Sequence, residues 1–293
     1  MKSLSAAALV LMLLSVSFPI AVSAQKKTPE PPKAPQLVRN TTRHEVFRLG
    51  YGSTLTVVGA PTGSITIEGW SRSEVDIVAE IQLRANTEAE LDQLAAVNTF
   101  GIDEDMNHVR VLTTGTHDKA FMRVAAKKFP KALLGLPWKI DYRIRVPQAV
   151  DLDINAGRGP VTITSVDGNI RLSASESETK LQLSSGTLSA IVGVGKVNLS
   201  IPARSWRGVG GEVRVGAGEI TFELLPGFNC DLNADILRSG QITDTFGGLA
   251  PREKPGITPQ TVKARVGAGG AFFQLTVGEG AIVIKKQTVD GKE

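Results

Sequence analysis

The sequence has 293 residues, of which 42% are hydrophobic, so the chain is long enough to bury a sizeable core. Its single cysteine excludes a disulfide framework and any cysteine-based zinc site, and its formal net charge of +4 gives no broad basic character. Thirty glycines and only 15 aromatic residues (10 Phe, 3 Trp and 2 Tyr) favour short strands separated by tight turns.

Residues 1–24 are predicted to form a cleaved signal for secretion. Lys2 supplies the positive charge, and residues 6–20 form an almost unbroken apolar run. Val22-Ser23-Ala24 then places small residues where signal peptidase cuts. A retained membrane anchor is the alternative, but the apolar run is short for a spanning helix and no later segment is long and apolar enough. We therefore expect a periplasmic, secreted or cell-surface protein.

A linker is predicted over residues 25–45, since residues 25–36 are rich in proline and lysine and favour an extended, solvated chain. From Val46 onward, short runs alternate apolar and polar residues with the period-two pattern of half-buried strands. Their apolar members are Leu55 and Val57, Ile65 and Ile67, Val75 and Ile77 in the first three runs, and Val109 and Val111 in a later one.

One helix is predicted in the N-terminal half. Thr87 with Glu90 forms a capping box, and Leu91, Leu94 and Ala95 follow at helical spacing, so the helix should end near Asn98. A further alternating strand is expected over residues 138–146. Pro147 ends it, because proline cannot continue the ladder inside a sheet.

The middle of the chain repeats a five-residue pattern of glycine, any residue, apolar, any residue, apolar. The units at Gly159, Gly168, Gly186 and Gly195 start at multiples of nine residues apart, and the missing member falls at Ser177. Similar units start at Gly211, Gly218 and Gly280. Each is interpreted as a five-residue strand plus a turn of about four residues, in which glycine takes the turn conformation.

Repeats this short cannot bury a face alone, so they must stack. We predict an all-β fold, a β-solenoid or β-helix-like stack of short strands with one helix in the N-terminal half and a helical insertion. A meandering β-sandwich is the alternative. The predicted domain spans residues 46–286, and residues 287–293 form a C-terminal tail.

The order of these motifs resembles the bacterial domain family DUF4097, named a "putative adhesin" family, which has β-solenoid-like relatives. The matching segments are GYGSTLTVVGAPTGSITI at 50–67, WSRSEVDIVAEI at 70–81, the helix at 87–97, YRIRVP at 142–147, the repeats at 151–201 and ARVGAGGAFFQLTVGEGAIVI at 264–284. The resemblance implies an envelope or surface-associated β-repeat protein and carries over no catalytic residue. The chain departs from the family at residues 116–137, an insertion.

The insertion lies in a strongly basic stretch, because residues 119–145 hold eight basic side chains and one acidic one. Phe121, Val124, Ala125 and Phe129 recur at helical spacing. One interpretation is a basic amphipathic helix that binds anionic lipid or an acidic envelope polymer. The predicted binding residues are Lys119, Arg123, Lys127, Lys128, Lys131 and Trp138. The alternative is a helix that caps an open end of the β stack, with its charges merely solvated.

No other motif indicates catalysis, a cofactor or a metal. The segment Gly193–Val197 lacks the first glycine and the Ser/Thr of a phosphate-binding loop. His44, His108 and His117 show no ligand or triad spacing, and residues 103–105 are interpreted as an acidic turn. Cys230 alternates with apolar residues and is interpreted as a buried small side chain, although a reactive thiol is the alternative.

Asp151 and Asp153 would share a strand face and form the one carboxylate pair that a glycosidase mechanism would need. Such positions are more often the solvent face of a strand. The leading prediction is therefore a non-catalytic structural or adhesion module of the cell envelope, with no cofactor and no nucleic-acid partner. Its expected partners are an envelope polymer, anionic lipid, or a protein that adds a strand. The alternatives are an envelope-stress sensor that binds lipid or an amphiphile through residues 118–138, and a polysaccharide-active β-helix enzyme.

Overall fold

The computed structural model describes residues 36–125 and 129–287 as a mainly β protein with one large mixed sheet. Its elements in chain order are β1 (Leu37–Arg48), β2 (Thr54–Val58), β3 (Ile65–Trp70), β4 (Glu74–Ala85), α1 (Glu88–Ala95), β5 (Thr99–Asp105), β6 (His108–Thr114), α2 (Lys119–Ala125), the 3-10 turn η1 (Lys131–Leu133), β7 (Trp138–Pro147), β8 (Asp151–Arg158), β9 (Val161–Thr164), β10 (Asn169–Gln182), β11 (Ser185–Ile201), β12 (Arg207–Leu224), β13 (Cys230–Asp244), β14 (Leu249–Pro251), β15 (Thr261–Val266) and β16 (Phe272–Lys286).

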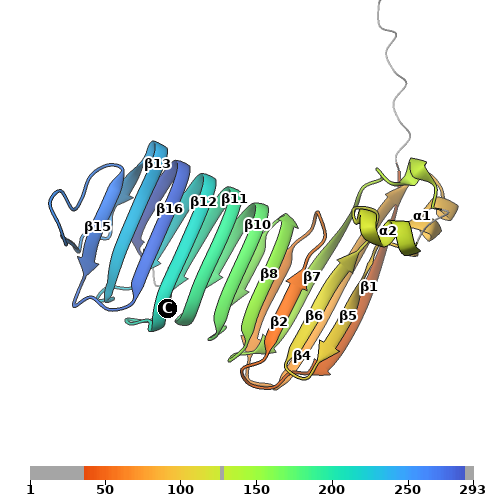
Figure 1. Cartoon of the computed structure of the whole chain (residues 1–293), viewed down its shortest axis with the longest axis horizontal. Helices are drawn as coiled ribbons and strands as arrows, with labels where there is room; N and C mark the ends of the chain where they lie inside the picture. The colour runs from red at the N-terminus through yellow and green to blue at the C-terminus, as the bar shows by residue number, and fades with distance from the viewer. Residues whose placement is uncertain (1–35, 126–128, 288–293) are drawn as a thin grey trace, which may run out of the picture. The chain divides into compact units, whose positions relative to one another are not determined.

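The main path through the sheet runs in the order β1-β4-β7-β3-β9-β10-β11-β12-β16-β13-β15-β14. The strands from β7 to β13 along this path pair in parallel, and the pairs at the two ends are antiparallel (Figure 1). A second row of strands joins β5, β6, β2 and β8 to β10. Parallel pairing fits the near-identical repeats, because equivalent residues then lie side by side.

The glycines of the nine-residue pattern stack across the parallel strands. Ser177 pairs with Gly195, Gly195 with Gly218, and Gly218 with Gly280, which confirms that Ser177 occupies the missing position of the repeat. We call this row the glycine column; it comprises Gly63, Gly159, Ser177, Gly195, Gly218, Gly280 and Gly240. All six glycines have φ between +134° and +142°, a region that side chains with a Cβ avoid.

The strands β10, β11, β12 and β16 are longer than the predicted five-residue units. Each runs through two units, with the glycine column between them, so two units combine into one 14- to 18-residue strand. In β11 the buried positions are Leu188, Ala190 and Val192 before the column and Val197, Leu199 and Ile201 after it. The period-two alternation therefore changes phase at the column, and both halves of each strand bury their apolar side chains in one core.

Helix α1 and an arginine of β1 both lie at the end of the sheet formed by β1 and β5. The predicted capping box is confirmed, since Thr87 and Glu90 accept hydrogen bonds from each other's backbone amides at 3.2 Å. Leu91 and Leu94 of α1 are buried. Arg43 of β1 donates to the carbonyl oxygen of Phe100 in β5 at 2.6 Å, so the two edge strands are tied together.

Two segments differ from the sequence prediction, whereas the insertion is partly helical as predicted. Strand β1 begins at Leu37, so residues 37–45, which were predicted as linker, pair with β4. Residues 103–105 form the end of β5 rather than an acidic turn, because they pair with residues 108–110 of β6. Asp103 and Asp105 also both bind Arg110 of β6 at 2.9 Å. The insertion contains the short helix α2 and the turn η1, and residues 126–128 lie outside the described ranges. No helix in the described ranges is long and apolar enough to span a membrane.

The buried hydrogen bond between Thr113 and Tyr142 gives the first stability prediction. The two side-chain oxygens lie 2.7 Å apart inside the core. Replacing Tyr142 by phenylalanine leaves the Thr113 hydroxyl unpaired and is expected to cost about 1–3 kcal/mol in guanidinium denaturation. In a Thr113→Val background the same substitution should cost less, because no buried hydroxyl is then left unpaired. An equal cost in both backgrounds would contradict this account.

Burial also raises the pKa of the Tyr142 hydroxyl well above its usual value. The folded state therefore retains a proton that the unfolded state loses. This contribution to stability is fully present below the unfolded pKa of about 10, and it declines as the pH rises above that value.

Candidate functional site

The structure places the predicted basic binding residues on different elements of the insertion. Lys119 and Arg123 lie on α2, Lys131 lies on η1, and Trp138 is the first residue of β7. Lys127 and Lys128 lie outside the described residues. Within the predicted apolar stripe, Phe121 and Phe129 are half-buried, but Val124 is 76% exposed. Val124 therefore faces solvent.

Trp138 contacts two residues that precede α2, Thr116 and His117. Its indole N–H donates to the Thr116 hydroxyl at 2.9 Å, and its ring lies 5.4 Å from the His117 ring. Trp138 is half-buried and packs against the core. Its polar atom therefore already has a partner within the protein. A lipid- or polyanion-binding role for this segment remains a prediction.

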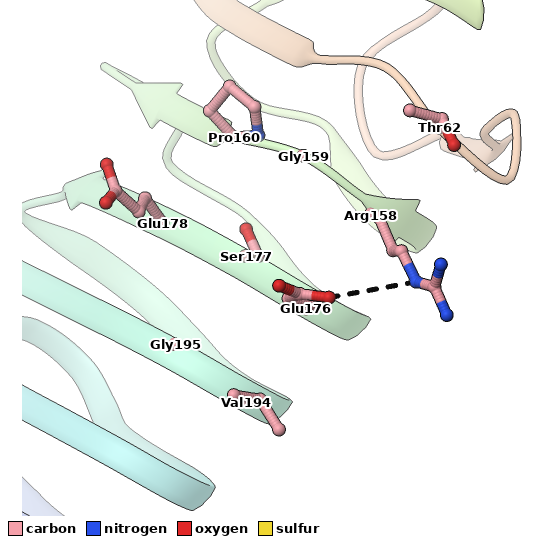
Figure 2. A pocket seen from close by; sticks show the side chains of 9 residues that line it. All are labelled: Thr62, Arg158, Gly159, Pro160, Glu176, Ser177, Glu178, Val194 and Gly195. Carbon is pink, nitrogen blue, oxygen red and sulfur yellow. Dashed lines mark ion pairs between the residues drawn. The ribbon is translucent and has the colours of Figure 1, made fainter. Parts of the chain in front are cut away.

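A different feature crosses strands that include β1, β4 and β7, where three hollows adjoin one another. We call them together the trough. The first hollow has a volume of about 460 Å³ and is lined by Thr62, Arg158, Gly159, Pro160, Glu176, Ser177, Glu178, Val194 and Gly195 (Figure 2). The second, of about 450 Å³, shares Thr62, Arg158, Gly159 and Pro160 with the first and adds Gly63, Ser64, Thr66, Glu80, Lys139, Asp141 and Arg143. The third, of about 210 Å³, shares Glu80, Lys139 and Asp141 with the second and adds Asn40, Thr41, Thr42, Ile81 and Gln82.

The glycine column explains why the surface is low along part of the trough. Gly63, Gly159 and Gly195 line the first two hollows. A Cβ at Gly159 would lie only 2.1 Å from the carbonyl oxygen of Gly63, so the two backbones are in close contact there. Because these positions carry no side chains, the trough has a floor of bare backbone with taller side chains on either side.

Six of the seven charged side chains of the trough lie next to a group of opposite charge. Lys139 binds Asp141 at 2.6 Å, Arg143 binds Glu80 at 2.9 Å, and Arg158 lies 3.7 Å from Glu176. The Arg158–Glu176 pair is the longest and most exposed of these, and Figure 2 shows it at one edge of the first hollow. The trough is therefore polar, with cations and anions interleaved along it.

Asp141 is the most enclosed carboxyl group of the trough. Burial raises its pKa and is the largest single effect, but hydrogen bonds from Lys139 and from the Ser64 amide and hydroxyl outweigh it together. The net result is a lowered pKa, so Asp141 stays ionised at neutral pH.

Of the other residues that the sequence analysis considered, Val194 and Gly195 line the first hollow, whereas Asp151, Asp153 and Cys230 do not join the trough. Asp151 accepts hydrogen bonds from the amide and side chain of Asn169, and Asp153 is exposed on the same strand. Cys230 is fully buried, as predicted, and burial raises the pKa of its thiol to about 12. Within residues 36–125 and 129–287, no group of three or more His, Cys, Asp or Glu side chains is placed to hold a metal ion.

Sequence reasoning missed the trough, although part of its signal was present. The glycine repeat was recognised as a set of turn positions. These positions form the floor of the trough because Gly159, Ser177 and Gly195 lie side by side on neighbouring strands. That pairing is not visible in the sequence.

The chain is similar in structure to bacterial proteins named for adhesion. A "putative cell adhesion protein" from Clostridium sporogenes matches with a TM-score of 0.43 at 11% identity, over 84% of this chain and 100% of that one. A "putative adhesin" from Bacteroides fragilis matches with a TM-score of 0.40 at 12% identity, over 84% and 97% of the two chains. A "putative lipid binding protein" from Parabacteroides distasonis matches with a TM-score of 0.23 at 10% identity, over 85% and 97%.

A scan against protein-family models and a search of curated proteins both gave no match. The resemblance to DUF4097 therefore stays a prediction. The structural similarities, at these TM-scores, establish neither a shared function nor a shared ligand.

Proposed function

We propose that this chain is a non-catalytic, adhesion-type structural module of the bacterial cell envelope. The observation that carries the proposal is the trough, a polar surface that crosses successive strands and that contains three ion pairs. Such a surface suits recognition of a repetitive ligand. The segment 1–24, read as a secretion signal, and the resemblance to DUF4097 support a periplasmic or surface location.

The proposal includes a coiled arrangement of the parallel strands. Ile170 pairs in parallel with Leu188, exactly one 18-residue step along the chain. A chain that comes back beside itself in the same direction has completed a circuit, and the phase change at the glycine column marks the corner between its two halves. We therefore favour a short β-solenoid over a meandering sandwich, in which the circuits from β8 and β9 through β10 to β11 are each built from two nine-residue units.

The carboxyl groups in the trough support binding rather than catalysis. A glycosidase needs one carboxyl group with a raised pKa to act as the acid and a second that stays ionised. Asp141 has a lowered pKa, while Glu80 and Glu176 each lie beside an arginine. A carboxyl group with a lowered pKa is a poor proton donor, so Asp141 does not suit the role of the acid.

A sedimentation assay with insoluble envelope polysaccharide tests the proposal. The secreted form of the protein is expected to sediment with the polymer and to release no new reducing ends. Release of reducing ends would instead support the polysaccharide-active enzyme. Failure to sediment with any envelope fraction would contradict the adhesion role.

A second candidate function rests on the exposed apolar side chains of the insertion. Val124 is 76% exposed and Leu134 is 44% exposed, and both lie in the segment that contains Lys119, Arg123 and Lys131. Apolar side chains beside cations favour contact with an anionic membrane. This segment is the proposed lipid-binding surface of an envelope sensor.

Vesicles that contain anionic lipid distinguish this second candidate. The Arg123→Glu/Val124→Asp double variant should lose vesicle binding, while the exposed control Lys254→Glu should keep it. Absence of vesicle binding by the unmodified protein would eliminate the sensor.

A further inference from the structure

The trough is long rather than compact. Its lining residues come from β1, β4, β7, β3, β10 and β11, from the end of β8, and from the segments that lead into β3 and β9. Apart from β8, these strands occupy seven consecutive positions in the sheet order. Neighbouring strands lie about 4.8 Å apart, so six spacings give a length of roughly 29 Å. A groove of this length fits an extended chain better than a small metabolite.

The uncharged polar side chains of the trough carry hydroxyl or amide groups. They are Asn40, Thr41, Thr42, Thr62, Ser64, Thr66, Gln82 and Ser177. These groups both donate and accept hydrogen bonds, as the hydroxyl groups of a sugar do. The lining thus matches a ligand that carries many alternating donors and acceptors along its length.

The charges of the trough do not favour a polyanion. Its cations are Lys139, Arg143 and Arg158, and its anions are Glu80, Asp141, Glu176 and Glu178, so the formal sum is 3 − 4 = −1. An anionic polymer or lipid surface would meet no net attraction here. The hydroxyl groups of a neutral chain would accept hydrogen bonds from the cations and donate hydrogen bonds to the carboxylates.

A peptide strand also fits poorly. Strand addition requires free backbone groups along a sheet edge, whereas the trough crosses strands whose neighbours on both sides are already paired from β4 to β11. Peptide grooves also use apolar pockets for anchor side chains. Among the lining residues, Pro160, Val194 and Ile81 are the larger apolar ones, and Ile81 is buried.

We propose that the trough binds an uncharged, hydroxyl-rich polysaccharide chain laid across the strands. This inference rests on the proposed function and names its ligand class. The glycine column supplies a low floor on which the sugar rings lie against backbone, Pro160 and Val194. Hydroxyl, amide and carboxylate groups on either side bind the sugar hydroxyls.

Thr62 offers the sharpest test, because it is exposed and lines both of the larger hollows. A Thr62→Trp substitution places a large ring across their junction. The matched control is Thr243→Trp, since Thr243 is also an exposed threonine and lies on β13 outside the trough. Thermal unfolding of both variants checks that each remains folded.

Titration calorimetry then compares soluble probes. These are a β-1,4-linked N-acetylglucosamine hexasaccharide, the corresponding disaccharide, a glucose hexasaccharide and an anionic uronate hexasaccharide. We expect at least one neutral hexasaccharide to bind, and to bind more tightly than the disaccharide. Thr62→Trp should weaken that binding by about tenfold or more, which corresponds to about 1.4 kcal/mol, and Thr243→Trp should leave it unchanged.

Three results would overturn the inference: no binding of any neutral hexasaccharide, a preference for the uronate, or unaltered binding by Thr62→Trp. If Thr62→Trp still sediments with envelope polysaccharide as the unmodified protein does, the adhesion role stands and only the trough is wrongly assigned. If neither protein sediments, the proposed function itself fails.

Discussion

Gly218→Ala is expected to destabilise the protein by about 3 kcal/mol or more. Gly218 has φ +141°, and a Cβ built there would lie 1.8 Å from the carbonyl oxygen of Gly195 on the neighbouring strand. The substitution therefore combines backbone strain with a clash against rigid backbone. Because the glycine column has the same geometry at Gly195 and Gly280, the neighbouring strands have no room to move apart.

Two control glycines separate these causes. Gly227 has φ +82° but open space around the added Cβ, so Gly227→Ala should cost only the strain, about 1–2 kcal/mol. Gly101 has neither feature, and Gly101→Ala should be close to neutral. Guanidinium denaturation followed by circular dichroism gives the three values. Equal costs at Gly218 and Gly227 would show that the close backbone stacking is not present.

Phe273→Ala is expected to cost about 3–5 kcal/mol. Phe273 is fully buried, and its ring centroid lies 5.3 Å from that of Trp206, 5.1 Å from that of Phe222 and 6.4 Å from that of Phe228. Removing the central ring leaves a cavity bounded by three large rings that cannot all move inward. The loss of both burial and edge-to-face contacts adds to the cost.

The preceding residue is a built-in control for this prediction. Phe272 points to the other face of β16 and is 41% exposed. Phe272→Ala should therefore cost less than about 1 kcal/mol under the same denaturation conditions. If the two phenylalanine variants lose similar stability, the strand is in a different register and the assigned core is wrong.

Local patterns predicted the elements that depend on neighbouring residues in the chain. The capping box at Thr87 identified α1, and the period-two alternation located β4 and β7 to within a few residues. The nine-residue spacing identified the glycine column, including Ser177 at the vacant position. These features are fixed by local backbone preference and by the side-chain period of a strand, so one sequence is enough to reveal them.

Features that depend on contacts between distant residues were not predictable. Trp206, Phe222, Phe228 and Phe273 are spread over 68 residues, and nothing in the spacing of these few aromatic residues shows that they meet. The linker prediction failed at Leu37–Glu45 because polar residues on an edge strand resemble a loop until β4 is paired with them. The exposure of Val124 likewise depends on what the short helix α2 packs against.

The trough belongs to the same class of feature. Its polar residues come from segments between Asn40 and Gly195 that no local pattern connects. The basic segment attracted the first functional prediction because its charges are contiguous in the sequence. Interleaved charges brought together by strand pairing give no such signal.

A crystal structure of the protein with a neutral hexasaccharide that it binds in solution would test the central claim most directly. The account predicts one intact, extended chain that crosses the strands between β1 and β11 and passes Thr62 and Pro160. A chain bound elsewhere, or one cleaved into shorter products within the trough, would contradict it.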